Sequence, residues 1–421
     1  MIKTITELNL ENKIVLLRTD YNVPLNKKKI DKYSSWRIDA TFETINYLIS
    51  KNSRIIIICH LGRPDGKVVE EFRLTPIAKY LSKTLKRKLS IYKSKNNPYV
   101  KKIGSLAETL YFLPRKKRMS NPPYFLPRKK KPSTPENMQG GDILMLENVR
   151  FHPEEQEASS IFAKKLASIG NVFINDAFAT AHRNDASIAL LPKILPSAAG
   201  FLLKNEIEAL ESLKKKNRKP LVFIMGGAKA QTKAELIKIF LPKVDEVLVG
   251  GVLANTVLAA KGIAVGKSVV DNEIAQLLKN IEITNTKLHL PVDVITSQTQ
   301  DGKNPIFISP VGNIASNNMI LDIGPDTISL FSAIIEKANT IVWNGPMGYT
   351  ETKKFSYGTE AILRAVIKNK KAKIIIGGGE SISLAAKHNF LKKIDFVSTG
   401  GGAMLMFLAD KALPGIEALK R

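Results

Sequence analysis

Four loops in the first half of the chain carry side chains suited to binding a small anionic ligand. Each follows a short apolar run, and their sequences are RTDYNVP (18–24), CHLGRP (59–64), LENVRFHPEE (146–155) and NDAFATAHRNDAS (175–187). Every loop contains an arginine, and a guanidinium group binds a phosphate or a carboxylate through two parallel hydrogen bonds. The pattern predicts a ligand with two anionic ends, contacted by the following residues: Asp20, Asn22, Arg37, His60, Arg63, Arg150 and Arg183.

The second half of the chain carries glycine-rich loops instead. IMGGAKAQTKAEL (224–236) passes from a predicted strand into a helix, with Lys229 and Lys233 one turn apart near the helix start. Backbone amides and the helix dipole favour an anion there, so the two lysines suit a polyphosphate. Triple glycines in IIIGGGES (374–381) and VSTGGGAM (397–404) leave backbone amides open to phosphate oxygens. These loops predict a nucleotide site.

Two common nucleotide-binding patterns are excluded. GIAVGKS (262–268) has three residues between its glycines where a P-loop requires four, and it follows no clear strand. The GxGxxG pattern of dinucleotide-binding folds does not occur in the sequence. The predicted nucleotide site therefore belongs to another class.

Short runs rich in isoleucine and valine alternate with amphipathic stretches along almost the whole chain. Runs of this kind are typical of parallel strands that helices cover on both faces. We predict strands before the loops described above and helices at 38–50 and 197–216. The fold class is therefore α/β, with two doubly wound parallel-sheet (Rossmann-like) domains joined by a hinge helix near residue 199. Ligands bind such sheets at the carboxyl ends of the strands, where these loops lie.

Residues 111–137 break this pattern. YFLPRKK occurs at 111–117 and again at 124–130, and the surrounding prolines disfavour a helix or a central strand. One interpretation is a surface insertion that the core tolerates. The other is a polybasic arm for RNA or an acidic surface, with aromatic side chains available for base stacking.

The composition narrows the class of protein. The chain has 421 residues and a formal net charge of +26. Only eight of its basic residues lie in 111–131, so most of the excess charge is spread out and selects no partner. A single cysteine, Cys59, excludes an internal disulfide, and no apolar run reaches the length of a membrane helix. The N-terminus lacks the apolar core of a signal peptide, so we expect a cytoplasmic protein.

The chain resembles the phosphoglycerate kinases from the first predicted strand to the last helix. RTDYNVP, CHLGRP, LENVRFHPEE, NDAFATAHR, GGAKAQTK, LDIGP, WNGPMGYTE, GGGES and VSTGGGAM occur in that family's order. The resemblance implies a two-lobed, monomeric enzyme of glycolysis. Its reaction would be reversible phosphoryl transfer from 1,3-bisphosphoglycerate to ADP, giving 3-phosphoglycerate and ATP, with Mg²⁺.

The resemblance also assigns roles to the matching positions. The triose ligand would contact Asp20, Tyr21, Asn22, Arg37, His60, Leu61, Gly62, Arg63, Arg150 and Arg183. The nucleotide would contact Lys233, Gly324, Glu351, Gly378, Gly379, Glu380 and Ser381, with Glu351 on the ribose hydroxyls and Glu380 at the metal. The catalytic set would be Arg37, Lys229, Gly378 and Gly401. Arg37 and Lys229 would neutralise the phosphoryl group during transfer.

The implied domains are a triose-phosphate-binding domain at 1–198 and a hinge helix with the nucleotide-binding domain at 199–404. A tail at 405–421 would pack back on the first domain. The chain departs from the family pattern at Glu380-Ser381, where Asp-Thr is usual, and at Thr232, where Asp is usual. No essential charge is lost, so we expect an active enzyme.

Two alternatives remain from the sequence. One is a catalytically weak homologue that acts mainly through its polybasic insertion on RNA or acidic surfaces. The other is a sugar or acetate kinase, which would lack the LENVRFHPEE and NDAFATAHR loops.

Overall fold

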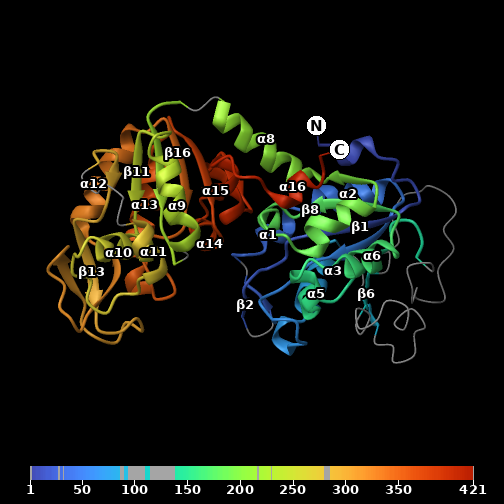
Figure 1. Cartoon of the computed structure of the whole chain (residues 1–421), viewed down its shortest axis with the longest axis horizontal. Helices are drawn as coiled ribbons and strands as arrows, with labels where there is room; N and C mark the ends of the chain where they lie inside the picture. Colours follow the sequence, from blue (N-terminus) through green and yellow to red (C-terminus); the bar gives the residue numbers. More distant parts are fainter. Residues whose placement is uncertain are drawn as a thin grey trace. The chain divides into compact units, whose positions relative to one another are not determined.

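The structure is a computed structural model that describes residues 2–26, 29–31, 33–85, 90–92, 110–113, 138–215, 218–228, 230–278 and 285–420. The chain forms two compact units: unit 1 comprises Met1–Glu208 and Ala412–Arg421, and unit 2 comprises Ala209–Lys411 (Figure 1). The division predicted from the sequence, at 198/199 and 404/405, differs from these bounds and stays a prediction.

Unit 1 is built on a seven-stranded sheet. Its strand order is β5 (Ser90–Tyr92), β6 (Leu110–Leu113), β7 (Ile143–Met145), β4 (Arg54–Ile58), β1 (Ile14–Thr19), β8 (Val172–Asp176), β9 (Ser197–Ala199). The strands from β7 to β9 are parallel, whereas β6 runs antiparallel to both β5 and β7. β1 lies between β4, which follows it in the large sheet, and β8, which the chain reaches only after it has formed β7 on the far side of β4.

The strands of this sheet contain unbroken apolar runs because helices pack against both of its faces. Side chains alternate between the faces of a strand, so Val15 and Leu17 belong to one apolar cluster and Leu16 to the other. The first cluster includes side chains from α2 (Phe42–Ser50) and α3 (Thr75–Thr84), and the second includes side chains from α6 (Ser160–Ala167). A strand buried on both faces needs no polar alternation.

Unit 2 contains a six-stranded parallel sheet. The strand order is β12 (Leu288–His289), β11 (Glu246–Val249), β10 (Leu221–Met225), β16 (Thr340–Asn344), β17 (Lys373–Gly377), β18 (Phe396–Ser398). The connections between its strands include the helices α9 (Ala230–Phe240), α10 (Gly251–Ala260), α12 (Pro325–Lys337), α13 (Tyr357–Lys368) and α14 (Gly379–Lys387), and α15 (Gly402–Leu408) follows the last strand. A small antiparallel sheet, β14 (Phe307–Pro310), β13 (Asp293–Ser297), β15 (Met319–Ile323), accompanies it.

The α/β fold class predicted from the sequence is confirmed, with corrections to individual elements. The predicted helix at 197–216 is divided: Ser197–Ala199 form β9, and α8 begins at Phe201 and ends at Lys215. The edge strand forms because β8 offers a free side, and Gly200 N continues the pairing by donating to Asn175 O over 2.9 Å. The predicted helix at 38–50 is likewise divided into α1 (Trp36–Asp39) and α2.

The predicted insertion also needs correction at its start. Tyr111, Phe112 and Leu113 belong to β6, which lies between β5 and β7 in the sheet. These aromatic and aliphatic residues favour a strand, and the first proline follows them. The rest of the predicted insertion, 114–137, lies outside the described residues. No observation on the described part of the chain favours the RNA-binding alternative.

Both chain ends belong to unit 1 (Figure 1). Ile2 and Lys420 form an isolated antiparallel bridge, and Gly415 N donates to Ala181 O over 2.8 Å. None of the helices within the described residues combines the length and the apolar character that a membrane crossing demands.

Candidate active site

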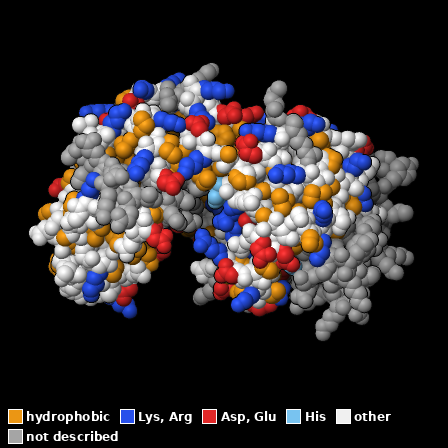
Figure 2. Space-filling view, viewed as in Figure 1, with side chains coloured by type: hydrophobic (Ala, Val, Ile, Leu, Met, Phe, Trp, Pro, Cys, Tyr) orange, Lys and Arg blue, Asp and Glu red, His pale blue; other side chains and the backbone are white. Residues whose placement is uncertain are grey.

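The predicted site residues of unit 1 follow strands that are neighbours in the sheet. Asp20 comes directly after β1, His60 follows β4, and the loop that carries Arg183 begins directly after β8. Because these parallel strands end at the same edge, their loops meet beside β1, where the direction of strand addition reverses from the β4 side to the β8 side. Figure 2 shows Lys and Arg side chains gathered on the visible surface near α1, the helix that carries Arg37.

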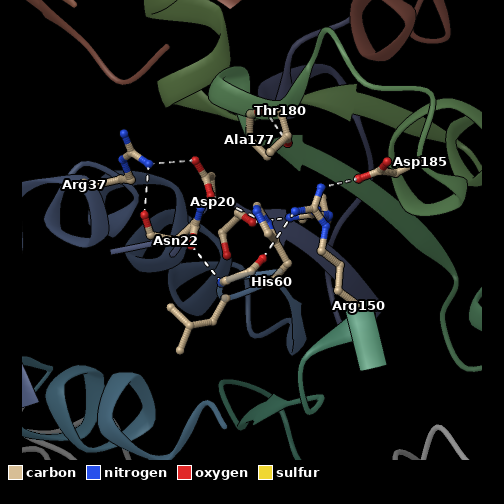
Figure 3. A network of polar contacts seen from close by, with 12 residues as sticks. Asp20, Asn22, Arg37, His60, Arg150, Ala177, Thr180 and Asp185 are labelled. Atoms are coloured by element: carbon tan, nitrogen blue, oxygen red, sulfur yellow. Dashed lines mark hydrogen bonds and ion pairs between the residues drawn. The ribbon is translucent and has the colours of Figure 1, made fainter. Parts of the chain in front are cut away.

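Hydrogen bonds join the first two of these loops to α1 (Figure 3). Arg37 donates from Nη1 to Asp20 Oδ2 over 3.2 Å and to Asn22 O over 3.1 Å. Asp20 Oδ1 accepts from Asn22 N over 3.1 Å. Asn22 Oδ1 accepts from Gly62 N over 2.9 Å, which ties the CHLGRP loop to the RTDYNVP loop. The side chain that is predicted to meet the phosphoryl group therefore belongs to the same network as the triose-binding loops.

Two arginines retain unused donors in this network. Arg150 donates from Nη1 to Gly62 O over 3.4 Å and pairs through Nη2 with Asp185 Oδ2 at 3.2 Å (Figure 3). The Nε atoms of Arg150 and Arg183 are buried and have no hydrogen-bond partner within the described residues. A buried donor left unpaired costs about 1–3 kcal/mol, and burial, followed by the charge of Arg150, lowers the pKa of Arg183. A bound anion would accept hydrogen bonds from the Nε atoms of both arginines.

His60 is buried beside these charges. Burial lowers its pKa well below the ordinary value, and the neighbouring arginines, Arg150 first, lower it further. The imidazole is therefore neutral at neutral pH. Its Nδ1 lies 3.7 Å from Asp20 Oδ1, too far for a direct hydrogen bond. A neutral His60 adds hydrogen-bonding capacity to the site without adding charge.

The remaining predicted triose contacts fall into two groups. The side chains of Tyr21 and Leu61 are buried in the apolar cluster, so their predicted contacts to a ligand depend on backbone atoms. Arg63 is exposed.

Arg18, which opens the RTDYNVP motif, does not belong to the ligand-facing set. It lies within β1, is fully buried, and donates from Nε to Ser187 Oγ over 2.8 Å. Its Nη2 lies 4.0 Å from Glu155 Oε1. The same carboxylate accepts from Ser187 N over 2.9 Å. Arg18 therefore joins β1 to the loops behind the site.

Asn148, which is not among the residues predicted from the sequence, is buried and orders the same loops. Its Nδ2 donates to Leu61 O over 2.7 Å and to Phe72 O over 3.0 Å. Its Oδ1 accepts from Arg150 N over 3.1 Å. The only sequence signal is its position within LENVRFHPEE, beside the arginine that was predicted.

Unit 2 gathers its predicted residues in the same way, at the carboxyl ends of β10, β16 and β17. Lys233 on α9 is buried and donates from Nζ to Gly226 O and, over 3.4 Å, to Asn344 O. Gly226 follows β10 and Asn344 ends β16, its neighbour in the sheet. Lys229, predicted to act with Lys233, lies outside the described residues.

The glycines after β17 and β18 form a cradle without side chains. Gly378 has a φ of 95°, which L residues rarely adopt, and a Cβ there would lie 3.4 Å from Gly345 N. Asn344 Nδ2 donates to Gly401 O over 3.2 Å, so Gly378 and Gly401 border the same amide. Among the described residues, no side chain caps the N-terminus of α14, which begins at Gly379. Uncapped amides at a helix N-terminus suit a phosphate.

A cavity of about 200 Å³ lies within unit 2. It brings Glu351 and Glu380 together, as the sequence predicted for a nucleotide site. Gly324 is not among the described residues that line it; this glycine caps α12 and packs against the Asp293 carboxylate. The lining includes Gly227, Gly251, Leu321, Tyr349, Glu351 and Glu380.

Glu380 and Ser381 have the donor types that Mg²⁺ requires. Glu380 is exposed, whereas Ser381 is 1% exposed and its Oγ has no hydrogen-bond partner within the described residues. The described residues contain no cluster of three or more His, Cys, Asp or Glu side chains that could hold a metal ion by itself. Mg²⁺ is commonly bound by one or two carboxylates together with substrate phosphates. The residues present fit that mode.

Comparison with known proteins identifies the family. The phosphoglycerate kinase family profile matches residues 5–113 and 125–411. A phosphoglycerate kinase of Moorella thermoacetica is 39% identical over 420 residues, covering 99% of this chain and 98% of the relative. The chain belongs to the phosphoglycerate kinase family. It is therefore a kinase of glycolysis, a phosphotransferase with a carboxyl group as acceptor, whose substrates are phosphoglycerate and ATP or ADP.

Solved structures of phosphoglycerate kinases have the same fold. The enzyme of Coxiella burnetii is 36% identical with a TM-score of 0.71, covering 100% of this chain and 99% of that chain. The enzyme of Pyrococcus horikoshii is 29% identical with a TM-score of 0.78, covering 100% of this chain and 98% of that chain. The unmatched residues 114–124 fall within the predicted insertion.

Proposed function

We propose that unit 1 binds 3-phosphoglycerate or 1,3-bisphosphoglycerate and that unit 2 binds ATP or ADP. The observation that carries the first assignment is that the Nε atoms of Arg150 and Arg183 are buried and have no hydrogen-bond partner in the part of the chain that the structure describes. A phosphate or carboxylate supplies the acceptors that these donors lack. Asp20 and Asn22 offer an acceptor and a donor to a hydroxyl group between the anionic ends of the ligand. Lys233 and the cradle of Gly378 and Gly401 support the second assignment.

The proposed reaction needs no covalent intermediate. The carboxylate oxygen of 3-phosphoglycerate attacks the γ-phosphorus of ATP, a new P–O bond forms, and the bond to the β-phosphate oxygen of ADP breaks. In the reverse direction an acyl phosphate is already a good donor. Positioning and neutralisation of charge therefore supply most of the acceleration. Arg37 and Lys229 are the proposed neutralising groups, and direct transfer requires a conformation in which both ligands touch the same phosphoryl group.

Mg²⁺ is the proposed cofactor, with Glu380 and Ser381 as the residues that would hold it together with the nucleotide phosphates. When bound, it would neutralise phosphate charge and orient the terminal phosphate. We further propose that the protein acts as a monomer, as the resemblance implies, and that it is located in the cytoplasm, as its N-terminal sequence predicts.

A substrate panel tests the proposed function. The full chain is incubated with ATP and Mg²⁺ and either 3-phosphoglycerate, acetate or a hexose, and ADP release is followed. Release that depends on 3-phosphoglycerate alone is expected, together with reduction of the acyl phosphate product by a coupled dehydrogenase. ATP turnover with acetate or hexose but not with 3-phosphoglycerate would overturn the proposal. Deletion of 114–124, which the family profile leaves unmatched, is expected to retain the activity.

A further inference from the structure

A buried carboxamide lines the cavity of unit 2 and has no hydrogen-bond partner among the described residues. Asn255 lies on α10, and only 4% of its surface is exposed. The side chain of the next residue, Thr256, has hydrogen-bond partners within the protein. Its Oγ1 donates to Val252 O over 2.7 Å and accepts from Asp271 N over 3.1 Å. Throughout the described part of the chain, no such contact exists for the Asn255 side chain. The Asn255 carboxamide is therefore available to a ligand that enters the cavity.

Asn255 differs from the other polar residues of the described cavity lining by its burial: Gln300 is exposed and Tyr349 is half-buried. The Asp322 carboxylate is buried, but its oxygens already accept from Ile323 N over 2.9 Å and from Gly358 N over 2.7 Å. Glu351 and Glu380 are exposed. Much of the remaining wall is apolar, with Val252, Val269, Met319, Ile320, Leu321 and Met347. Among the described lining residues, Asn255 is therefore the buried polar side chain that remains available to a ligand.

The chemistry of a carboxamide selects among purines. Its oxygen accepts and its nitrogen donates, side by side, which matches the 6-amino donor and the N7 acceptor of adenine. Guanine presents two acceptors, O6 and N7, at the same edge. One of the two hydrogen bonds is then lost and two acceptor oxygens face each other.

We propose that Asn255 determines the base specificity of the enzyme by pairing with the 6-amino group and N7 of adenine. The apolar wall holds the faces of the ring, and Asn255 reads its edge. The inference rests on the proposed function in taking unit 2 as the nucleotide site. It adds which base the site selects and which residue selects it.

Equilibrium binding of ADP and of GDP to the full chain tests the proposal. The wild-type protein is expected to bind ADP about tenfold more tightly than GDP, the usual scale for one bidentate base contact. Asn255→Leu keeps the branched shape of the side chain but removes both hydrogen-bonding groups, and it is expected to bind both nucleotides with the same affinity. The control is Val252→Ala, which shortens the apolar wall. It is expected to weaken both nucleotides equally and to leave their ratio unchanged.

A second variant covers the case in which Asn255→Leu fails to fold. Asn255→Asp keeps the acceptor for the 6-amino group but places a negative charge beside N7. ADP is expected to bind more weakly than to wild type, and GDP, with two acceptors facing the carboxylate, more weakly still. Equal affinity of wild type for ADP and GDP would overturn the inference, as would an unchanged ratio in both variants.

Phosphoryl transfer separates this inference from the proposed function. If 3-phosphoglycerate is phosphorylated equally well by ATP and GTP, the base assignment is wrong and the proposed function stands. If the variants abolish the preference for ADP but no transfer to 3-phosphoglycerate occurs, the base assignment stands and the proposed function is wrong.

Discussion

Asn148 Nδ2 donates a 2.7 Å hydrogen bond to Leu61 O. Through its Oδ1 the same side chain receives the backbone N–H of Arg150 over 3.1 Å. One buried amide thus sets the positions of the CHLGRP loop and of the arginine that borders it.

Replacement of Asn148 by Leu is expected to raise KM for 3-phosphoglycerate by about tenfold and to leave KM for ATP unchanged. The reason is that Leu61 O and Arg150 N both lose their partner, so the triose-binding loops shift while unit 2 is not affected. Steady-state kinetics with each substrate varied separately measures the split. Each unsatisfied buried group also costs about 1–3 kcal/mol of stability.

The matched control is Asn369, a buried asparagine of unit 2. Its Nδ2 donates to Ile335 O over 2.7 Å and to Ala338 O over 2.9 Å, and its Oδ1 accepts two backbone N–H groups. Asn369→Leu is expected to lower stability to a similar extent without raising KM for 3-phosphoglycerate. A rise in that KM of equal size in both variants would show that Asn148 acts through stability alone.

The stability of the protein is expected to fall as pH rises from about 4 to about 7. Burial raises the pKa of Asp176 to about 7 and that of Asp322 to about 7. An acid whose pKa is higher in the folded state takes up a proton on folding, so its contribution is complete below pH 4 and is lost through pH 7. Asp176→Asn is expected to remove a slope on the order of 1 kcal/mol per pH unit.

Urea unfolding at several pH values measures that slope. Asp176 suits the test because its Oδ1 accepts from Leu203 N over 3.1 Å, whereas its Oδ2 is buried and has no partner within the described residues. The control is Asp326→Asn, which changes an exposed acid. An unaltered slope in Asp176→Asn would contradict the assignment of a protonated carboxyl group.

Removal of Mg²⁺ by a chelator is expected to abolish phosphoryl transfer. The Glu380→Gln variant is expected to need a Mg²⁺ concentration at least about tenfold higher than wild type to reach its half-maximal rate. The amide keeps the size of the side chain but lacks the charge that the metal prefers. Titration of the rate with Mg²⁺ measures the shift. Glu336→Gln, an exposed glutamate of α12, serves as control and should leave the titration unchanged. If Glu380→Gln follows the wild-type curve, the metal is held elsewhere.

Many of the strands can be predicted from the residues that form them. Ile55 to Ile58 form β4 and Ile374 to Ile376 lie in β17 because strands buried on both faces need uninterrupted apolar side chains. The division of 197–216 into β9 and α8 was not predictable from the segment itself. It depends on the open side of β8, which only the assembled sheet provides.

The candidate site was predictable where a residue acts through its own charge. Arg37, Arg150 and Lys233 stand out by type and by position after a strand. Arg18 has the same signal but is buried against Glu155 and Ser187, partners far along the chain. Asn148 and Asn255 carry no charge, and their proposed roles depend on which groups surround them after folding.

The turnover of Arg37→Ala tests the central claim most directly, because Arg37 is the described residue proposed to neutralise the phosphoryl group. Its control is Arg54→Ala: Arg54 also belongs to unit 1 but begins β4 at the opposite edge of the sheet and donates to Asn12 O over 3.0 Å. We expect kcat with ATP and 3-phosphoglycerate to fall at least about 100-fold in Arg37→Ala and less than twofold in Arg54→Ala. An Arg37→Ala enzyme that retains more than half of the wild-type turnover would contradict the account.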